Sequence, residues 1–342
     1  MLIHKPIIED SSQIKNNLFS KKFIATVVAR QALFIYLKNL DIQNFLVPRF
    51  LPEGVYAPLK LANKTIHYYD YSRNFEINFD NFDFNKKNFA IHYIHPFGLY
   101  IKKNVDLLRK LKANGSTVID DRALTLPIKN YVEFANATLY SLYKSAGIPY
   151  GGILFTDNNF IDLNSTDNFE LKNKMKQNLN FYGNPNLKNT SSFKFRILNK
   201  IYGNSLDYSG LVSDLDLNKP EILDLDYINK LNYVDFDAIS KKRIEIAMQY
   251  FEKLPKNLLW IKDIDACNTQ SLIGFPIICN NPFDLYKKLM KKNIHSFILN
   301  KGWWFDNEPT NHLYKNHLLL PINYHFSEKD IDYIVYAVKK ML

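Results

Sequence analysis

The chain has 342 residues, of which 46% are hydrophobic and 23% charged, an ordinary globular balance that can supply one large core or two moderate ones. Its 44 Lys and Arg against 34 Asp and Glu give a net charge of +10, but the basic residues are scattered and show no recognition-helix spacing, which argues against a nucleic-acid partner. No segment is apolar for long enough to span a membrane, and the N-terminus resembles no secretory signal, so we expect a soluble, cytoplasmic protein.

Neither the two cysteines nor the histidines form a metal-binding pattern. The pairs His92 with His95 and His312 with His317 bring no cysteine or carboxylate at metal-ligand spacing. The cysteines form no disulfide framework and are typical of a reduced, cytosolic protein. We therefore expect no metal site.

The first half of the chain alternates between strand and helix patterns after an expected N-terminal arm at residues 1–21. Helical spacing appears over residues 23–40, where small and β-branched residues lead into it, and again near 55–61 and 105–113. Strand patterns lie between these segments, at residues 44–48, 65–70 and 89–94. Such alternation predicts an α/β protein with a mostly parallel sheet and helices on both of its faces.

The second half of the chain has a different organisation. Residues 157–220 are polar and rich in asparagine, and residues 226–254 return to a long helical pattern. From residue 275 onward, short strand and helix patterns form a compact α+β unit that ends in a helix at 328–341. We expect two domains, a large one over residues 1–235 and a small C-terminal α+β domain over residues 236–342.

The segment from residue 117 to residue 152 contains the main functional signal. A buried strand ends in Asp120 and Asp121, and a second strand leads to Lys144 in a turn rich in glycine and proline. Ligands of open α/β sheets bind at the carboxyl ends of the strands. A carboxylate and a lysine at that edge suit pyridoxal 5'-phosphate (PLP), whose aldehyde bonds a lysine amine and whose ring nitrogen pairs with an acid. An exposed loop lysine and a strand-end turn acid are the alternatives.

These segments, in this order, resemble the DegT/DnrJ/EryC1/StrS family of sugar aminotransferases. His95-Pro96-Phe97-Gly98, followed by a helix and Val118-Ile119-Asp120-Asp121, looks like the family's H-x-[FY]-G, helix and V-I-E-D run. Residues 48–70, 275–299 and 318–322 look like further blocks of the family. The resemblance covers nearly the whole chain. It implies the aspartate-aminotransferase fold, fold type I of the PLP enzymes, with a mixed, mostly parallel, seven-stranded sheet in the large domain.

Two catalytic residues follow from the resemblance. Lys144 falls on the family's Schiff-base lysine, because Gly152 follows it by eight residues as the second glycine of a G-G pair. Asp121 falls on the aspartate that pairs with the pyridine nitrogen, and Asp120 stands where the family often has Glu. Because successive residues of a strand point to opposite faces, only one of the two carboxylates can reach the ring.

The resemblance also implies where the phosphate of the cofactor is held. The N–H groups of Ala29, Arg30 and Gln31 begin a helix, and such groups bind phosphate readily. Ser141 would add a hydroxyl donor. The sequence departs from the family here, because Ala29-Arg30 replaces a Gly-[ST] pair and Ser141 lies three residues before Lys144 instead of five. An ordinary core helix is the alternative for this segment.

Two further departures concern the cofactor ring. Pro52 stands where the family has an aromatic residue that stacks on the ring, and we expect His95 to take that place, with Phe50 and Tyr56 as alternatives. Leu124 stands where a His or Gln usually contacts the ring oxygen. We therefore expect His95 among the cofactor-binding residues.

The function implied by the resemblance is the transfer of an amino group, with glutamate as donor, to a nucleotide-linked keto-sugar. Such reactions serve the biosynthesis of surface polysaccharides, lipopolysaccharide among them, and of amino sugars. The family also implies a homodimer with its active site at the subunit interface. Two alternatives stay open: a dehydratase-like relative, which Lys144 disfavours because that branch has His in its place, and a non-catalytic relative that binds a ligand or partner.

Overall fold

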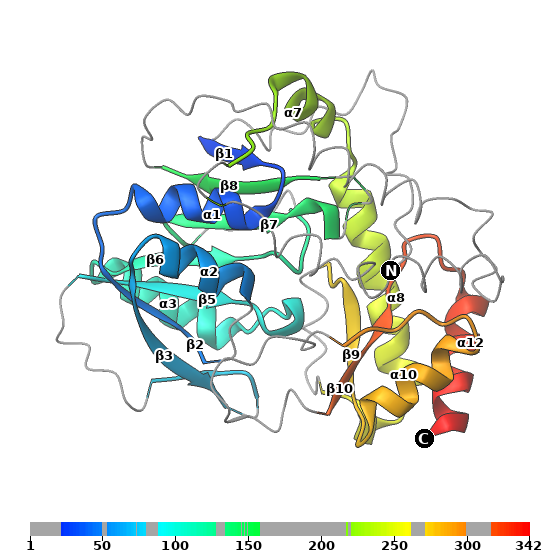
Figure 1. The fold of residues 1–342 in the computed structure, drawn as a ribbon. Coiled ribbons are helices and arrows are strands. Elements are labelled where there is room, and N and C mark those ends of the chain that lie inside the picture. The colour runs from blue at the N-terminus through cyan, green and yellow to red at the C-terminus, as the bar shows by residue number, and fades with distance from the viewer. Residues whose placement is uncertain are drawn as a thin grey trace.

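A computed structural model gives the fold of the chain (Figure 1). It describes residues 22–49, 53–72, 74–79, 88–127, 134–144, 146, 148, 150–157, 217, 220–260, 271–298 and 316–342. The expected N-terminal arm, most of the polar segment 157–220, Pro52 and the ring-stacking alternative Phe50 lie outside the described residues.

One large mixed sheet forms the centre of the N-terminal part of the molecule. Its strands are β1 (Phe23–Thr26), β2 (Asn44–Pro48), β3 (Thr65–Tyr71), β4 (Ile77–Asn78), β5 (Phe89–Ile94), β6 (Thr117–Asp121), β7 (Ala137–Ser141) and β8 (Gly152–Thr156). Their order across the sheet is β1-β8-β7-β6-β5-β2-β3-β4. Strands β7, β6, β5, β2 and β3 run parallel, and antiparallel pairs join β8 to β7, β1 to β8 and β4 to β3.

The mostly parallel α/β sheet is as predicted from the sequence, but its strand number is not. The described residues form an 8-stranded sheet in place of the expected seven strands. The two-residue strand β4 adds to the edge because Ile77 and Asn78 pair with Tyr71 and Asp70 at the end of β3. So short an edge strand has no hydrophobic alternation of its own, and the sequence pattern cannot reveal it.

Helices cover both faces of the sheet. Helices α1 (Ala29–Lys38) and α2 (Glu53–Leu61) share a buried core with Ile119 of β6 and Leu139 of β7. Helix α3 (Lys102–Ala113) packs on the opposite face, where its buried side chains share a core with Val118. The helical pattern expected from residue 23 begins only at Ala29, because the preceding segment forms the edge strand β1.

The C-terminal unit is built around a small antiparallel sheet of two described strands, β9 (Gly274–Ile278) and β10 (His317–Pro321). Helices α7 (Leu225–Leu231) and α8 (Phe236–Lys253) lead into it, and α10 (Pro282–Met290) and α12 (Glu328–Met341) complete it (Figure 1). Ser327 caps α12 through a reciprocal capping box with Asp330. The strand expected at residues 294–299 is reduced, within its described part, to one bridge between Phe297 and Leu319.

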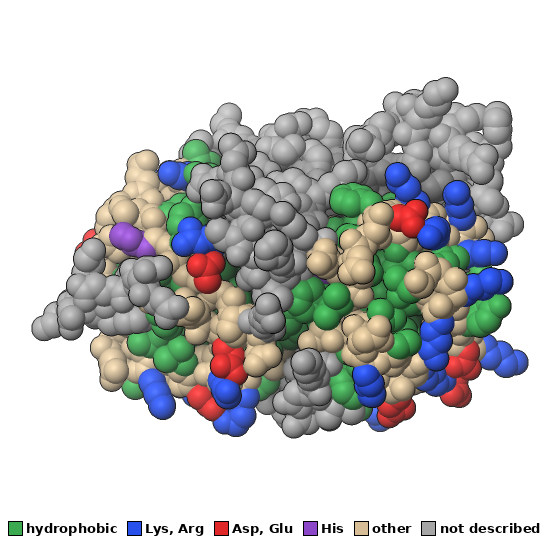
Figure 2. Space-filling view, turned by 90° about the horizontal axis from the view of Figure 1, so that it is seen from below, with side chains coloured by type: hydrophobic (Ala, Val, Ile, Leu, Met, Phe, Trp, Pro, Cys, Tyr) green, Lys and Arg blue, Asp and Glu red, His purple; other side chains and the backbone are tan. Residues whose placement is uncertain are grey.

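The surface of the described residues carries mixed charge. Figure 2 shows Lys and Arg side chains spread over one face of the molecule, with Asp and Glu among them. None of the helices that the structure describes is both long and apolar enough to cross a membrane. A cluster of three or more His, Cys, Asp or Glu that could hold a metal ion is also absent from these residues.

Candidate active site

The carboxyl edge of the large sheet brings several of the predicted site residues to one face. Ile119 and Leu139 lie in the core under α1, and the side chains two residues further along the same strands, Asp121 and Ser141, point to the same face. Strand β7 leads directly into the short 3-10 turn η3 (Leu142–Lys144), which ends at the predicted lysine. The fold thus places Asp121, Ser141 and Lys144 at the edge that faces the start of α1.

Asp121 is held at the end of β6 by two hydrogen bonds. Its Oδ2 lies 3.0 Å from Nε2 of His92, and its Oδ1 accepts a bond of 2.9 Å from the backbone N–H of Ala123. The two side chains are buried, and Nδ1 of His92 has no hydrogen-bond partner among the described residues. His92 thus contacts Asp121 through Nε2 alone. A carboxylate has about four acceptor positions, so Asp121 can accept a further hydrogen bond at the sheet edge.

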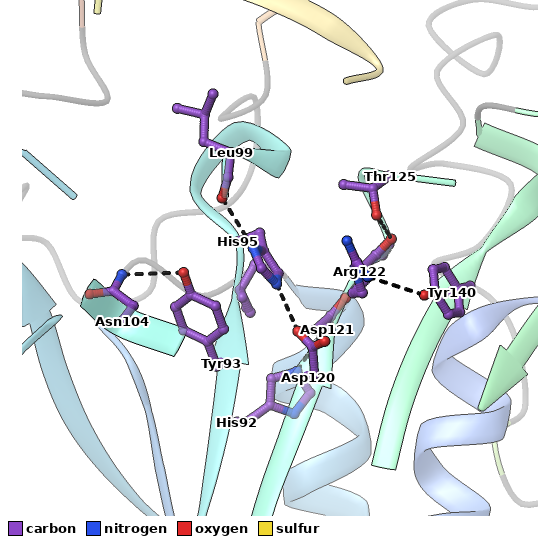
Figure 3. A network of polar contacts seen from close by, with 12 residues as sticks. His92, Tyr93, His95, Leu99, Asn104, Asp120, Asp121, Arg122, Thr125 and Tyr140 are labelled. Atoms are coloured by element: carbon purple, nitrogen blue, oxygen red, sulfur yellow. Dashed lines mark hydrogen bonds and ion pairs between the residues drawn. The ribbon is translucent and has the colours of Figure 1, made fainter. Parts of the chain in front are cut away.

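Asp120 has a different partner on the opposite face. Its Oδ1 lies 2.7 Å from Nε2 of His95, whose Nδ1 lies 3.1 Å from the carbonyl oxygen of Leu99 (Figure 3). Both of these oxygens are acceptors, so both ring nitrogens of His95 are placed to donate, and His95 and Asp120 form a buried pair. The ring of His95 also lies edge-on against Tyr93, with 4.6 Å between the ring centroids. Burial raises the pKa of Tyr93, so its phenol stays neutral beside this pair.

This arrangement separates the roles of the two neighbouring carboxylates. Asp120 is paired with His95 on the face of α3, whereas the Asp121 carboxylate lies on the face of α1. The structure does not bring His95 to Asp121, because its ring nitrogens are both engaged on the face of α3. Sequence reasoning missed His92, although its position within strand β5, two residues before Ile94, puts it on the same face as Asp121.

Lys144 ends a turn that is fixed by packing on both sides. Leu142 and Tyr143 are buried in a core that also contains residues of α7 and α8. The backbone N–H of Leu142 donates to the carbonyl oxygen of Gly151 at 2.8 Å. Gly151 has a φ of +143°, a conformation that side chains rarely adopt. Lys144 itself is half-buried, so a fixed turn presents a lysine that small molecules can still reach.

The start of α1 has the features of an anion site. Its N-cap residue, Val28, supplies no side-chain hydrogen bond to the first turn. The N–H of Gln31, which the sequence predicted as a phosphate donor, is instead bonded to the Val28 carbonyl oxygen at 3.0 Å. Both polar atoms of the Gln31 side chain, and the Oγ of Ser141, are buried and have no hydrogen-bond partner among the described residues. A buried polar atom without a partner costs about 1–3 kcal/mol. An anion with several acceptor oxygens would supply partners for these side chains at the positive end of the helix.

A glycine lets the helix start approach the sheet closely. Gly152 pairs with Ser141 on one side and with Thr26 on the other. Ala29 lies directly against it in the structure. The first turn of α1, with Ala29 and Gln31, therefore lies close to Ser141. Arg30 belongs to the same turn and is half-buried.

Comparison with known proteins supports the fold. No protein-family model and no curated protein sequence matches the chain. A DegT DnrJ EryC1 StrS aminotransferase from Brucella abortus is 17% identical and aligns over 94% of this chain and 86% of its own, with a TM-score of 0.60. PseC of Helicobacter pylori, an aminotransferase involved in the biosynthesis of pseudoaminic acid, is 16% identical over 94% and 86%, with a TM-score of 0.59.

A third structure, NtdA of Bacillus subtilis with the bound cofactor PMP, is 16% identical over 94% of this chain and 74% of its own, with a TM-score of 0.61. At these identities the likeness concerns the fold. The chain has the fold of PLP-dependent aminotransferases of fold type I, as the sequence resemblance implied.

Proposed function

We propose that this protein is a PLP-dependent aminotransferase. The main support for the proposal is that a carboxylate, an amine and an anion-binding helix start lie around one edge of the sheet. Asp121 offers a carboxylate, Lys144 a reachable amine, and the start of α1 the side chains of Gln31 and Ser141, whose polar atoms have no hydrogen-bond partner among the described residues. PLP has a basic ring nitrogen, an aldehyde and a phosphate, and each of these groups finds a matching residue. The described residues therefore fit the cofactor.

When bound, PLP supplies an aldehyde and an electron-withdrawing ring that stabilises negative charge on a substrate carbon. The part of Asp121 is to hold a proton on the ring nitrogen by offering its carboxylate to it. His92 is a positioning residue in this proposal, because its Nε2 lies 3.0 Å from one oxygen of Asp121 and fixes the orientation of the carboxylate.

Lys144 is the proposed catalytic residue. Its Nζ would hold the aldehyde carbon of the cofactor, and as a free amine the same Nζ would accept the proton that leaves the substrate carbon. Both tasks need a fixed backbone and an accessible side chain, and the η3 turn provides them through buried Leu142 and Tyr143 beside half-buried Lys144.

The phosphate is held, in this proposal, by the start of α1 at Ala29 and Arg30, together with the side chains of Gln31 and Ser141. These donors replace the family's Gly-[ST] pair, and the Arg30 guanidinium adds a positive charge to the same turn. Binding the phosphate satisfies polar atoms that are otherwise buried without partners among the described residues.

We further propose that the amino acceptor is a nucleotide-linked keto-sugar and that glutamate is the donor, in the biosynthesis of surface polysaccharide or amino sugars. The named activity of the H. pylori neighbour supports a sugar substrate, and the net charge of +10 suits a diphosphate-linked one. The proposal includes a cytoplasmic homodimer and the division into domains at residues 235 and 236.

Absorption spectroscopy tests the proposal. The purified protein with added PLP is expected to show a visible absorption band that sodium borohydride bleaches, and Lys144→Ala is expected to lose this band. Lys60→Ala, at an exposed position of α2, is the matched control and should keep it. Absence of the band in the wild-type protein would contradict the proposed function. A screen of nucleotide-linked amino sugars for loss of the band then identifies the substrate.

A further inference from the structure

The turn from His95 to Leu99 contacts three separate parts of the molecule. The His95 ring bonds Asp120 at 2.7 Å, and the backbone N–H of His95 donates to the carbonyl oxygen of Asp121 at 3.5 Å. His95 also bonds Leu99 within the turn, through Nδ1 (Figure 3). This short segment is therefore bonded to both of the carboxylate residues at the end of β6.

The tip of the same turn belongs to the core of the C-terminal unit. Phe97 lies 4.8 Å from the ring of His317 on β10 and 6.2 Å from that of Trp260, measured between ring centroids. It is buried in one cluster with residues of β9, β10, α8 and α12. Its φ of +54° is unfavourable for a non-glycine residue, and the surrounding contacts hold it there.

A third contact joins the turn to the segment that follows Asp121. Gly98 has a φ of +82°, and a Cβ at this position would lie 2.9 Å from the carbonyl oxygen of Leu124. Leu124 directly follows Ala123, whose N–H bonds the Asp121 carboxylate. The turn thus contacts the backbone of Asp121 itself, through His95, and the loop after Asp121, through Gly98.

We infer that His95 and Asp120 form a positioning pair, which transmits the docking of the C-terminal unit, through Phe97, to the orientation of the Asp121 carboxylate. The inference rests on the proposed function and adds two residues to it. In this inference His95 and Asp120 act through Asp121 and not by contact with cofactor or substrate, because both ring nitrogens of His95 are engaged by Leu99 and Asp120. A buried pair tolerates little displacement, so a shift of Phe97 moves the His95 N–H and the backbone of Asp121 with it.

Asp120→Asn and Phe97→Leu, alone and combined, test the inference. Asp120→Asn removes the charge but keeps a hydrogen-bonding side chain of the same size, and Phe97→Leu loosens the contact with His317 without emptying the core. Each single variant is expected to weaken PLP binding about tenfold, because residues that orient a binding group typically contribute about this much to affinity. Because both act through one turn, the double variant should weaken it by about the same factor as either single change.

The measurements are the PLP dissociation constant from fluorescence titration, the split between kcat and KM for the half-reaction, and the thermal unfolding of the apo protein. We expect kcat to fall while KM for the amino substrate stays within about twofold, since the pair orients the cofactor anchor alone. Asp106→Asn, which removes an exposed charge from α3, is the matched control and should change none of these.

The possible outcomes separate this inference from the proposed function. Variants that melt earlier but bind PLP with wild-type affinity would show a purely structural pair and overturn the inference. Independent losses, about a hundredfold in the double variant, would also overturn it, because Phe97 and Asp120 would then act separately. A wild-type protein that binds no PLP would overturn the proposed function and the inference together. If Phe97→Leu does not fold, Phe97→Met replaces it in the same cycle.

Discussion

Gly152 lies so close to Ala29 that a Cβ built on it would approach the backbone nitrogen of Ala29 to 2.1 Å. No side-chain movement can relieve such a contact, because the atoms it meets belong to the backbone of the first turn of α1. The start of this helix therefore contacts the sheet at Gly152, where only glycine leaves enough space, and Gly152 pairs with Ser141.

Gly152→Ala is consequently expected to push the start of α1 away from the sheet. The apo protein should lose about 3 kcal/mol of unfolding free energy, at the upper end of what overpacking costs, and its affinity for inorganic phosphate and PLP should fall. Gly54→Ala is the matched control, because a Cβ there meets nothing within 4 Å. On α2 this change should be neutral or stabilise by up to about 1 kcal/mol. Denaturant titration and PLP titration of both variants check the prediction.

Gln31→Met should change apo stability and cofactor affinity in opposite directions. The Gln31 amide is buried without hydrogen-bond partners among the described residues, so an apolar side chain of similar length is expected to stabilise the apo protein by about 1–2 kcal/mol. The same change removes a phosphate donor and should weaken PLP binding about tenfold. Exposed Gln43 provides the control, as Gln43→Met should leave PLP binding unchanged. Equal PLP affinity in Gln31→Met would exclude Gln31 from the phosphate site.

Stability should fall in mild acid because of His295. Burial lowers the pKa of this histidine from 6.5 to about 4, so the folded protein binds fewer protons than the unfolded chain between these values. Stability is thus full above pH 6.5 and declines toward pH 4, by at most on the order of 3 kcal/mol from this group. Melting temperatures measured from pH 7.5 to pH 4 should decline less steeply for His295→Gln. Parallel pH profiles for the two proteins would contradict this prediction.

Local pattern was sufficient for much of the fold and for part of the site. The strand ending in Asp121 and the glycine-rich turn after Lys144 are local features, because alternation and turn residues act over a few positions. The expected α/β class and parallel sheet follow from the order of such segments.

Pairing between distant strands could not be predicted in the same way. His92 and His95 are equally plausible neighbours of an aspartate in the sequence, but the register of β5 on β6 aligns Ile94 with Asp121 and decides between them. Strand β5 ends at Ile94, and the turn that begins at His95 leads the chain to the face of α3. That register depends on the packed core, which no local pattern describes.

Asp121→Asn is expected to be far more damaging than Asp120→Asn, although the two residues are neighbours. The amide oxygen introduced in place of the carboxylate can still accept from Ala123 or His92, so the backbone and the fold should be unchanged. A neutral amide cannot hold a proton on the cofactor ring nitrogen, and we expect kcat/KM to fall about 1,000-fold, or about 4 kcal/mol of transition-state stabilisation. Asp120→Asn should cost only about tenfold, through orientation. Single-turnover rates of the two variants test this prediction. Equal losses in both would contradict the different roles proposed for Asp120 and Asp121.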